Sequence, residues 1–310
     1  MQHNLTEEEM SRLREQEYNA TVVRFDHANP ELAILRVRPD LAIPPHRAGQ
    51  YTSLGVGYWE PRVPQCQEEE LAPDQWTKLV KRAYSISCPV LGDDGELLRI
   101  KDEDFLEFYV VLVRGAEKRP PALTPRLFSL KQGGRLFVAE KITGNYTLEH
   151  VRPDDTVIFM ATGTGEAPHN KMLLELLRAG HRGMIASVVC VRYQSDLGYL
   201  ATHQQVAARV PNYRYITLTT REKHNLANKL YIQDLVRTGE LEKRISRPLD
   251  PATTHVFLCG NPAMIGVPHK GSDGNYTYPK PTGVVELLEA RGFRCDHPRE
   301  PGNIHFEKYW

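Results

Sequence analysis

The chain has 310 residues, of which 41% are hydrophobic and 25% are charged. At ~100–200 residues per domain this length suggests two domains, and the composition excludes a largely disordered chain. Lysine plus arginine and aspartate plus glutamate each number 39, so the formal net charge is zero. Because general nucleic-acid binders carry a basic excess, we expect no nucleic-acid partner.

The sequence carries no signature of a membrane segment or a metal site. No apolar run approaches the ~18–20 residues that a membrane span needs. The polar, acidic start MQHNLTEEEMSRLREQE is unlike a signal peptide. The five cysteines are scattered and lack a C-x-x-C pair, which argues against a disulfide framework and against zinc or iron–sulfur ligation. We therefore expect a soluble, cytoplasmic protein with no metal and no membrane partner.

The first part of the chain predicts a short helix followed by a β-rich domain. Thr6 and Glu9 have the spacing of a capping box ahead of a helix that runs to about Glu17. Short β-rich runs follow, separated by turn signals and without a long helical pattern between them, which indicates an antiparallel β-barrel. The acidic stretch Glu60–Val80 is interpreted as a loop insertion. The predicted strands are Ala20–Phe25, Leu32–Val37, Gln50–Leu54, Arg82–Ser87, Phe105–Val113 and Arg135–Ala139.

After Pro153 strands and helices alternate, which predicts a parallel sheet wrapped by helices. The predicted strands are Thr156–Ala161, Met184–Val191, Arg214–Thr219 and His255–Leu258. The predicted helices are Pro168–Ala179, Leu197–Arg209, Leu230–Thr238 and Gly283–Ala290. The expected organisation is an N-terminal helical extension (1–18), an antiparallel β-barrel (19–152) and an α/β parallel-sheet domain (153–310).

A glycine-rich turn, Gly163-Thr164-Gly165, lies between a predicted strand and a predicted helix in VIFMATGTGEAPHNKM. Such a turn points backbone N–H groups at an anion above it, and pyrophosphate is the expected ligand. The motif is neither a P-loop nor G-x-G-x-x-G. Taken alone, it is equally compatible with a tight turn that binds nothing.

Two other motifs combine residue types that suit a cofactor. Arg82-Ala83-Tyr84-Ser85 offers a cation, an aromatic face and a hydroxyl, which could hold a phosphate, a ring and a ring nitrogen. In strands, however, such residues usually just form the surface. The motif CGNPAM, from Cys259 to Met264, follows a predicted strand at the end where α/β sheets bind ligands. A lone cysteine there is usually a small buried hydrophobe.

In this order, the motifs resemble those of the ferredoxin–NADP reductase family of flavoproteins, most closely the bacterial ferredoxin/flavodoxin–NADP reductases. The resemblance runs from Asn19 to Trp310. It comprises AGQYTSLG, RAYS, LEFYVVLV and ALTPRLFSL in the first domain, and ATGTGEAP, VRYQSDLGYL, CGNPAM and EKYW in the second. It implies FAD bound mainly by the barrel, NADP(H) bound by the α/β domain, and a monomer.

The resemblance also implies individual FAD contacts. Arg82 would pair with the FAD pyrophosphate, Tyr84 would stack on the isoalloxazine, and Ser85 would lie near flavin N5. The terminal Tyr309 and Trp310 would cover flavin or adenine rings. The implied FAD-binding positions are Arg82, Ala83, Tyr84, Ser85, Tyr109, Val111, Ala122, Leu123, Thr124, Thr164, Tyr309 and Trp310.

NADPH is favoured over NADH because a 2′-phosphate needs cations, whereas NAD sites offer an acidic residue to the ribose. Arg192, Arg221 and Lys229 match the basic positions of the bacterial reductases. Any one of them alone would be an ordinary surface cation. The implied NADP-binding positions are Gly163, Thr164, Gly165, Arg192, Arg221, Lys229, Cys259, Gly260, Asn261 and Met264.

The implied activity is hydride transfer between NADP(H) and flavin N5, with single electrons passing to or from an acidic ferredoxin or flavodoxin. Ser85 and Cys259 are the candidate catalytic residues beside the hydride path, and Glu307 is the candidate for proton transfer. Candidate docking residues are Arg24, Arg36, Arg38 and Arg47. Two alternatives remain open: the reductase component of an oxygenase system, and a non-catalytic NADP(H)- or flavin-binding sensor.

The sequence departs from the family pattern in the glycine turn and in two insertions. Glu166 stands where the family usually has an apolar residue, and its carboxylate would repel a pyrophosphate. We expect it to point away or to pair with a cation, for which Lys171 and His169 are the candidates. The two insertions are Glu60–Val80 and the polar segment Gly266–Thr282, and we expect the second to form an ordered loop.

Overall fold

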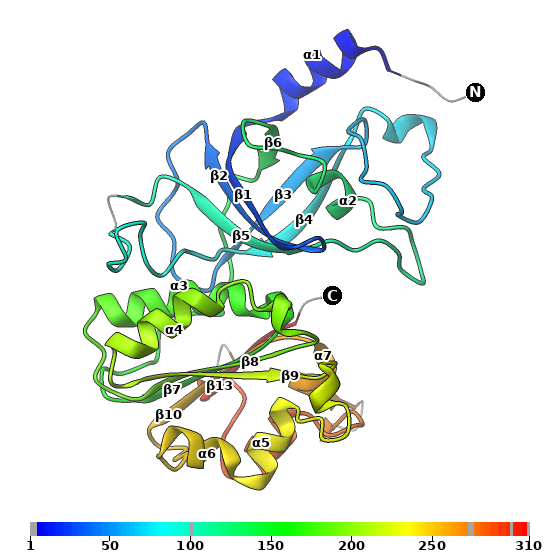
Figure 1. The fold of residues 1–310 in the computed structure, drawn as a ribbon. Helices are drawn as coiled ribbons and strands as arrows, with labels where there is room; N and C mark the ends of the chain where they lie inside the picture. Colours follow the sequence, from blue (N-terminus) through cyan, green and yellow to red (C-terminus); the bar gives the residue numbers. More distant parts are fainter. Residues whose placement is uncertain (1–4, 100–101, 272–275, 298–299, 309–310) are drawn as a thin grey trace. The chain divides into compact units, whose positions relative to one another are not determined.

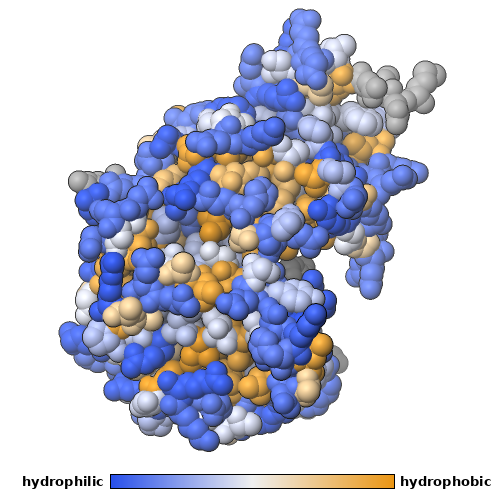
Figure 2. Space-filling model, viewed as in Figure 1, coloured by the Kyte–Doolittle hydropathy of each residue, from blue (hydrophilic) through white to orange (hydrophobic). Residues whose placement is uncertain are grey.

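The computed structural model describes residues 5–99, 102–271, 276–297 and 300–308. The chain divides into two compact units (Figure 1). The first unit comprises Met1–Cys88 and Leu98–Asn145, and the second comprises Pro89–Leu97 and Tyr146–Trp310. On the visible face of each unit hydrophilic residues predominate, with apolar residues scattered among them (Figure 2).

The first unit begins with the predicted helix, α1 (Glu7–Glu17), which the Thr6–Glu9 capping box starts. The helix has no buried residue of its own, so it depends on contacts at its C-terminal end. There Arg14 Nε donates to Glu60 Oε1 at 2.8 Å, and the Tyr18 hydroxyl donates to the same carboxylate at 2.9 Å. The first residue of the predicted insertion therefore anchors the N-terminal extension.

A six-stranded antiparallel sheet forms the body of the first unit, in the order β4-β3-β6-β1-β2-β5. Its strands and short helix are β1 (Ala20–Asn29), β2 (Leu32–Pro39), β3 (Tyr51–Gly57), β4 (Leu79–Ser85), β5 (Leu106–Val111), α2 (Thr124–Leu127) and β6 (Arg135–Val138). Leu35, Leu54, Phe108 and Leu136 are fully buried in its core. All six predicted strands are confirmed.

The predicted antiparallel β-barrel is confirmed as a barrel-like antiparallel sheet, and this sheet is not closed among the described residues. Within the described ranges, the edge strands β4 and β5 are joined through one isolated bridge between Ser87 and Glu107 and through no continuous ladder. The bridge follows the end of β4, where the Ser87 N–H donates to the Glu107 carbonyl at 2.8 Å. Alternating apolar residues specify a curved sheet with a buried face, but they do not specify whether its edges pair.

The second unit is a five-stranded parallel sheet in the order β13-β10-β7-β8-β9. Its main strands are β7 (Thr156–Thr162), β8 (Ile185–Val191), β9 (Tyr213–Thr219), β10 (Thr254–Gly260) and β13 (Ile304–Lys308). The strand order reverses at β7, and such a switch point is where α/β sheets form a ligand crevice at the carboxyl ends of their strands.

Helices cover both faces of this sheet (Figure 1). They are α3 (Glu166–Arg178), α4 (Leu200–Arg209), α5 (Ile232–Thr238), α6 (Glu240–Ile245), α7 (Pro262–Ile265) and α8 (Val284–Glu289). α3 and α4 lie on one face and α5 and α6 on the other. The α5–α8 face is an apolar core that includes Ile158, Met160, Leu235 and Val284. The sequence predicted α3, α4, α5 and α8 but not the short helices α6 and α7.

Both insertions are held to the rest of the fold by defined contacts. The first ends at residue 78, because β4 begins at Leu79, and the buried Arg126 contacts its Glu69 at 2.7 Å. The second contains the small hairpin of β11 (His269–Lys270) and β12 (Tyr276–Thr277). It leaves and rejoins the fold where Gly266 meets Gly283, so closely that a Cβ added to Gly266 would lie 2.5 Å from the Gly283 Cα.

Two buried histidines of the second unit make stability depend on pH. Burial lowers the pKa of His169 to about 3 and that of His305 to about 4. Above pH 6.5 both are neutral whether the chain is folded or unfolded. Below pH 6.5 the unfolded chain takes up protons that the folded chain excludes, so stability falls as the pH falls. We expect each histidine to lower the free energy of unfolding by about 2 kcal/mol between pH 6.5 and pH 5.

Urea unfolding at pH 7 and pH 5, in the wild type and in His169→Phe, measures this effect. The phenylalanine keeps a ring against Phe159, whose centroid lies 4.9 Å from that of His169. It removes the hydrogen bond from Tyr146, so the variant is expected to be less stable at both pH values. Its loss of stability on acidification should be smaller than that of the wild type by about 2 kcal/mol. An equal loss in both proteins would contradict the assignment of a neutral, buried His169.

Candidate functional site

The glycine turn and the end of β10 form one junction at the carboxyl edge of the parallel sheet. Gly163–Gly165 is a 3-10 turn between β7 and α3. A Cβ added to Gly165 would lie 2.3 Å from the Cys259 carbonyl oxygen, and one added to Gly260 would lie 2.3 Å from Thr162 Oγ1. The Asn261 N–H donates to the same hydroxyl at 2.7 Å. The structure thus brings together two motifs that are far apart in the sequence.

The backbone of the turn is open toward an incoming anion. Gly163 has φ +54°, and a Cβ added to it would meet nothing within 4 Å. Thr164 is half-buried and Gly165 is buried. An anion can therefore approach the N–H groups of this turn and of the first turn of α3, where the helix dipole favours negative charge.

The end of β10 places two of the three predicted catalytic residues side by side. Cys259 and Glu307 are direct neighbours in the register of β10 and β13. Cys259 is fully buried, whereas Glu307 is half-buried. Beyond them Asn261 is exposed and caps α7, its Oδ1 accepting from the Ala263 N–H at 2.9 Å, and Met264 is buried. The sheet thus orders CGNPAM around the junction.

Two cations follow the ends of β8 and β9, and a third lies in the loop after β9. The Arg221 N–H donates to the Arg192 carbonyl at 2.8 Å, which joins the two strand ends through their backbones. Lys229 lies further along the same loop. The side chains of Arg192, Arg221 and Lys229 are exposed, and none has an ion-pair partner in the part of the chain that the structure describes. Exposed cations without acidic partners suit an anionic ligand.

Two residues that the sequence did not single out fasten the loop that carries Arg221 and Lys229. Glu222 Oε1 accepts from the Gln194 N–H at 2.8 Å. The Asn225 amide donates to the Thr219 carbonyl at 3.1 Å and to the Thr219 hydroxyl at 2.5 Å. Polar residues are common in such loops, so no pattern in the sequence distinguishes these two from their neighbours.

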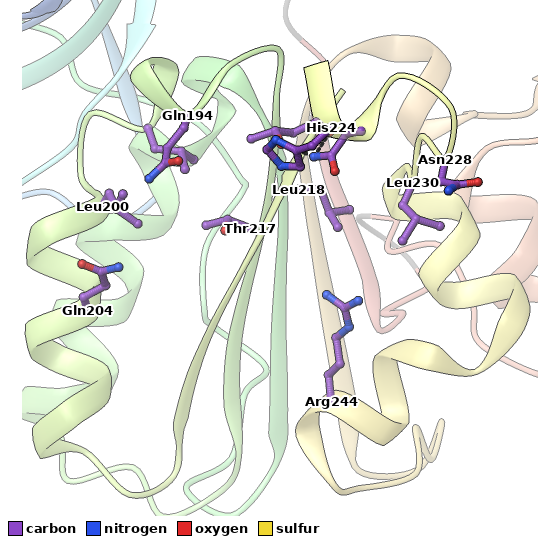
Figure 3. A pocket seen from close by; sticks show the side chains of 12 residues that line it. Gln194, Leu200, Gln204, Thr217, Leu218, His224, Asn228, Leu230 and Arg244 are labelled. Carbon is purple, nitrogen blue, oxygen red and sulfur yellow. Dashed lines mark hydrogen bonds between the residues drawn. The ribbon is translucent and has the colours of Figure 1, made fainter. Parts of the chain in front are cut away.

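A cavity of about 380 Å³ lies between this loop and α4, beside the edge strand β9. Figure 3 shows Gln194, Leu200 and Gln204 on the α4 side, His224, Asn228 and Leu230 on the loop side, and Arg244 reaching up from α6. The remaining lining residues are Leu197, Thr217, Leu218, Thr219 and Asn225. Fastening the loop therefore also shapes this cavity.

In the first unit, the predicted flavin residues of β4 and β5 come together. The Tyr84 ring packs edge-on against Phe108 at 6.3 Å between centroids, and burial raises the Tyr84 pKa. Ser85 on β4 and Tyr109 on β5 each lie two residues along the chain from the Ser87–Glu107 bridge. Both are buried, whereas Val111, two residues further along β5, is 38% exposed.

The remaining predicted FAD residues occupy the rim of this group. Arg82 and Ala83 are exposed on β4, and the Arg82 guanidinium donates to the Lys81 carbonyl at 2.8 Å. Leu123 is buried, Ala122 is half-buried, and Thr124 Oγ1 accepts from the Val113 N–H at 3.0 Å. An exposed cation, a packed tyrosine and an exposed valine fit a phosphate-bearing ring cofactor. Tyr309 and Trp310 lie outside the described residues.

The expected partners of Glu166 were wrong. Its carboxylate does turn away from the glycine turn, but Oε1 accepts from the Tyr215 hydroxyl at 2.8 Å and lies 3.2 Å from His203 Nε2. His169 instead contacts Tyr146. Both partners of Glu166 come from elements distant in the sequence, α4 and β9, which spacing along the chain does not reveal.

One docking candidate is also corrected. Arg36 pairs with the fully buried Glu107 at 2.7 Å and is itself largely covered, so it is not available to a partner. Arg24, Arg38 and Arg47 are exposed. Across the described ranges, no cluster of three or more His, Cys, Asp or Glu side chains has the arrangement of a metal site. The helices of the same ranges include none with the length and apolar character that a bilayer span requires.

Comparison with known proteins gives consistent results. Residues 159–270 match the model of the oxidoreductase NAD-binding domain family. The chain is 31% identical to the flavodoxin/ferredoxin–NADP reductase of Escherichia coli over 71% of this chain and 76% of that protein. It is 29% identical to the protein of the same name from Buchnera aphidicola over 94% of this chain and 98% of that protein.

Solved structures share the fold. A ferredoxin NADP+ reductase from Neisseria gonorrhoeae, with bound FAD and NADP, aligns with a TM-score of 0.69 at 19% identity. The alignment covers 94% of this chain and 98% of that chain. At this identity the likeness supports the two-domain architecture of an antiparallel sheet followed by a parallel one.

The close contact at the junction makes Gly165 intolerant of a side chain. We expect Gly165→Ala to lower the free energy of unfolding by about 1–3 kcal/mol, the typical cost of overpacking. The added methyl group would clash with the Cys259 backbone, which cannot shift without disturbing β10. Urea unfolding measures this loss. Gly180→Asn is the matched control: Gly180 has φ +68° with no neighbour within 4 Å of an added Cβ, and asparagine tolerates that conformation. Equal effects of the two substitutions would contradict the packing argument.

Proposed function

Because the chain belongs to the family of flavodoxin/ferredoxin–NADP reductases, we propose that it is an FAD-dependent oxidoreductase. It would transfer a hydride between NADP(H) and flavin, and it would exchange single electrons with ferredoxin or flavodoxin. The observation that carries the proposal is the junction of the glycine turn with Cys259–Asn261, beside three exposed cations that have no acidic partner in the described residues.

The second unit would bind the dinucleotide. The backbone of Gly163, Thr164 and Gly165 would hold the pyrophosphate, and Cys259, Gly260, Asn261 and Met264 would form the adjoining wall. Arg192, Arg221 and Lys229 would hold the 2′-phosphate. Lysine offers a point charge, whereas each arginine offers a planar fork that can bind a phosphate through two hydrogen bonds.

The first unit would bind FAD. Arg82 would pair with its pyrophosphate, and the Tyr84 and Tyr109 side chains with Val111 would line the flavin. Ala83, Ala122, Leu123 and Thr124 would complete the site through backbone and hydroxyl contacts. From the second unit we propose contacts by Thr164, Tyr309 and Trp310, the last two on the evidence of the sequence alone.

For the hydride transfer, the main role of the protein would be to position the flavin and the nicotinamide. When bound, the flavin supplies two-electron exchange with the nicotinamide and one-electron exchange with a protein carrier. Ser85 would orient the flavin by a hydrogen bond, and the buried Cys259 would shape the contact and exclude water. Glu307, half-buried beside Cys259, would hold or deliver a proton.

We propose an acidic ferredoxin or flavodoxin as the protein partner, docking on exposed arginines that include Arg24, Arg38 and Arg47. The chain would act as a monomer in the cytoplasm, without a nucleic-acid or membrane partner. The neutral net charge supports the absence of a nucleic-acid partner, because it provides no general attraction to polyanions.

Anaerobic mixing of the FAD-loaded protein with NADPH or NADH tests the function. We expect NADPH to bleach the flavin absorbance faster than NADH does. Arg221→Ala should raise KM for NADPH by about 10-fold or more, since a charged hydrogen bond is lost, and should leave KM for NADH unchanged. Lys223→Ala, which removes an exposed cation of the same loop, is the matched control. Equal rates with both nucleotides would contradict 2′-phosphate binding, and failure to bind FAD would contradict the enzyme itself.

The fastened loop gives a second test. Asn225→Ala removes both hydrogen bonds to Thr219 and should raise KM for NADPH several-fold with little change in kcat, because the loop must then be ordered by the ligand. Asn228→Ala changes an exposed asparagine of the same loop and serves as the control. If Asn228→Ala raised KM as much as Asn225→Ala does, these hydrogen bonds would not be what positions the loop.

A further inference from the structure

A carboxylate is buried directly beneath the glycine turn. Glu166 is the first residue of α3, adjacent to Gly165, and only 1% of its surface is exposed. Its Oε1 accepts a hydrogen bond from the Tyr215 hydroxyl and lies near His203 Nε2. Its Oε2 is buried and has no hydrogen-bond partner among the described residues. A charge in this position interacts with anything bound at the start of α3.

His203 is held in one orientation by its neighbours. Its Nδ1 lies 2.7 Å from the Tyr213 hydroxyl, and its Nε2 lies 2.9 Å from Asn170 Oδ1. Its ring stacks on Tyr215 with centroids 4.4 Å apart and planes 13° apart. Because the two oxygens near Nε2, from Asn170 and Glu166, are both acceptors, Nε2 carries a hydrogen that it directs at them.

The electrostatics of this arrangement have a definite sign. The start of α3 carries a partial positive charge that favours a pyrophosphate. The negative charge of Glu166 opposes an anion there, and the interior screens charges far less than water does. The Tyr215 hydroxyl and His203 Nε2–H draw the carboxylate away from the turn and offset part of its charge.

We propose that Glu166, Tyr215 and His203 form a charge-compensating unit that sets how tightly the glycine turn binds the pyrophosphate of NADP(H). This inference rests on the proposed function and goes beyond it, because it assigns a tuning role to three side chains that would not themselves touch the dinucleotide. Glu166 weakens pyrophosphate binding, and its two partners limit that weakening. The unit is thus a set of positioning residues, and the binding of the 2′-phosphate does not depend on it.

Direct binding measurements with two probes separate these effects. NADP+ carries the pyrophosphate, whereas adenosine 2′-monophosphate carries only the 2′-phosphate. Glu166→Gln keeps an acceptor for Tyr215 but removes the charge, and it should tighten NADP+ binding by about threefold to tenfold, as expected for one unit charge acting across partly screened protein. Tyr215→Phe keeps the ring stack but removes the donor, and it should weaken NADP+ binding.

The double variant Glu166→Gln/Tyr215→Phe completes a double-mutant cycle. Its NADP+ affinity should match that of Glu166→Gln, because the hydroxyl matters only when the carboxylate is charged. In all three variants the affinity for adenosine 2′-monophosphate should stay at the wild-type value. If these side chains had a purely structural role, the substitutions would weaken the binding of both ligands and tighten the binding of neither. A gain in NADP+ affinity is therefore the distinguishing result.

The outcomes divide cleanly. If the wild type binds neither NADP+ nor adenosine 2′-monophosphate, the proposed function fails. If it binds both, the inference is overturned by a Glu166→Gln variant whose NADP+ affinity is unchanged or lower. Equal changes for the two probes would overturn it as well. Should Glu166→Gln not fold, Tyr215→Phe decides alone: unaltered NADP+ affinity in that variant overturns the proposal.

Discussion

The second unit depends on a contact between two backbones. The turn after β7 and the end of β10 approach so closely that neither Gly165 nor Gly260 has room for a Cβ. Thr162 Oγ1 completes the contact by accepting the Asn261 N–H. Because parallel strands end at a common edge, this contact fixes the start of α3 and the CGNPAM segment as one rigid piece, and the loops that carry the cations are built around it.

The two faces of the parallel sheet differ in chemistry. The face under α5–α8 is an apolar core, whereas the face under α3 and α4 holds buried histidines, tyrosines and a carboxylate. His203 contacts Tyr213 and Asn170, and Glu166 Oε1 accepts from Tyr215, so the burial of these groups costs less than that of isolated polar groups. Charged and polar groups on that face contribute to the electrostatic potential at the carboxyl edge of the sheet, whereas an apolar core would not.

Local sequence patterns predicted most of the elements and the order of the motifs. The capping box, the strand runs and the glycine turn are each encoded by residues within a few positions of one another, and α1, β7 and the turn were found where expected. β13 and the short helices α6 and α7 were not predicted, because short elements leave little periodicity. The partners of Glu166 and the fastening role of Asn225 depend on which elements the fold places together, and neither follows from neighbouring residues.

The contact between Gly266 and Gly283 has an implication for how this fold varies. The segment between them leaves and returns at a single point, so its chain ends are already held together by the core on either side. Closing a loop whose ends are fixed costs entropy that grows only slowly with its length. The fold can therefore accommodate a segment of a different length between these two glycines without repacking α7 or α8.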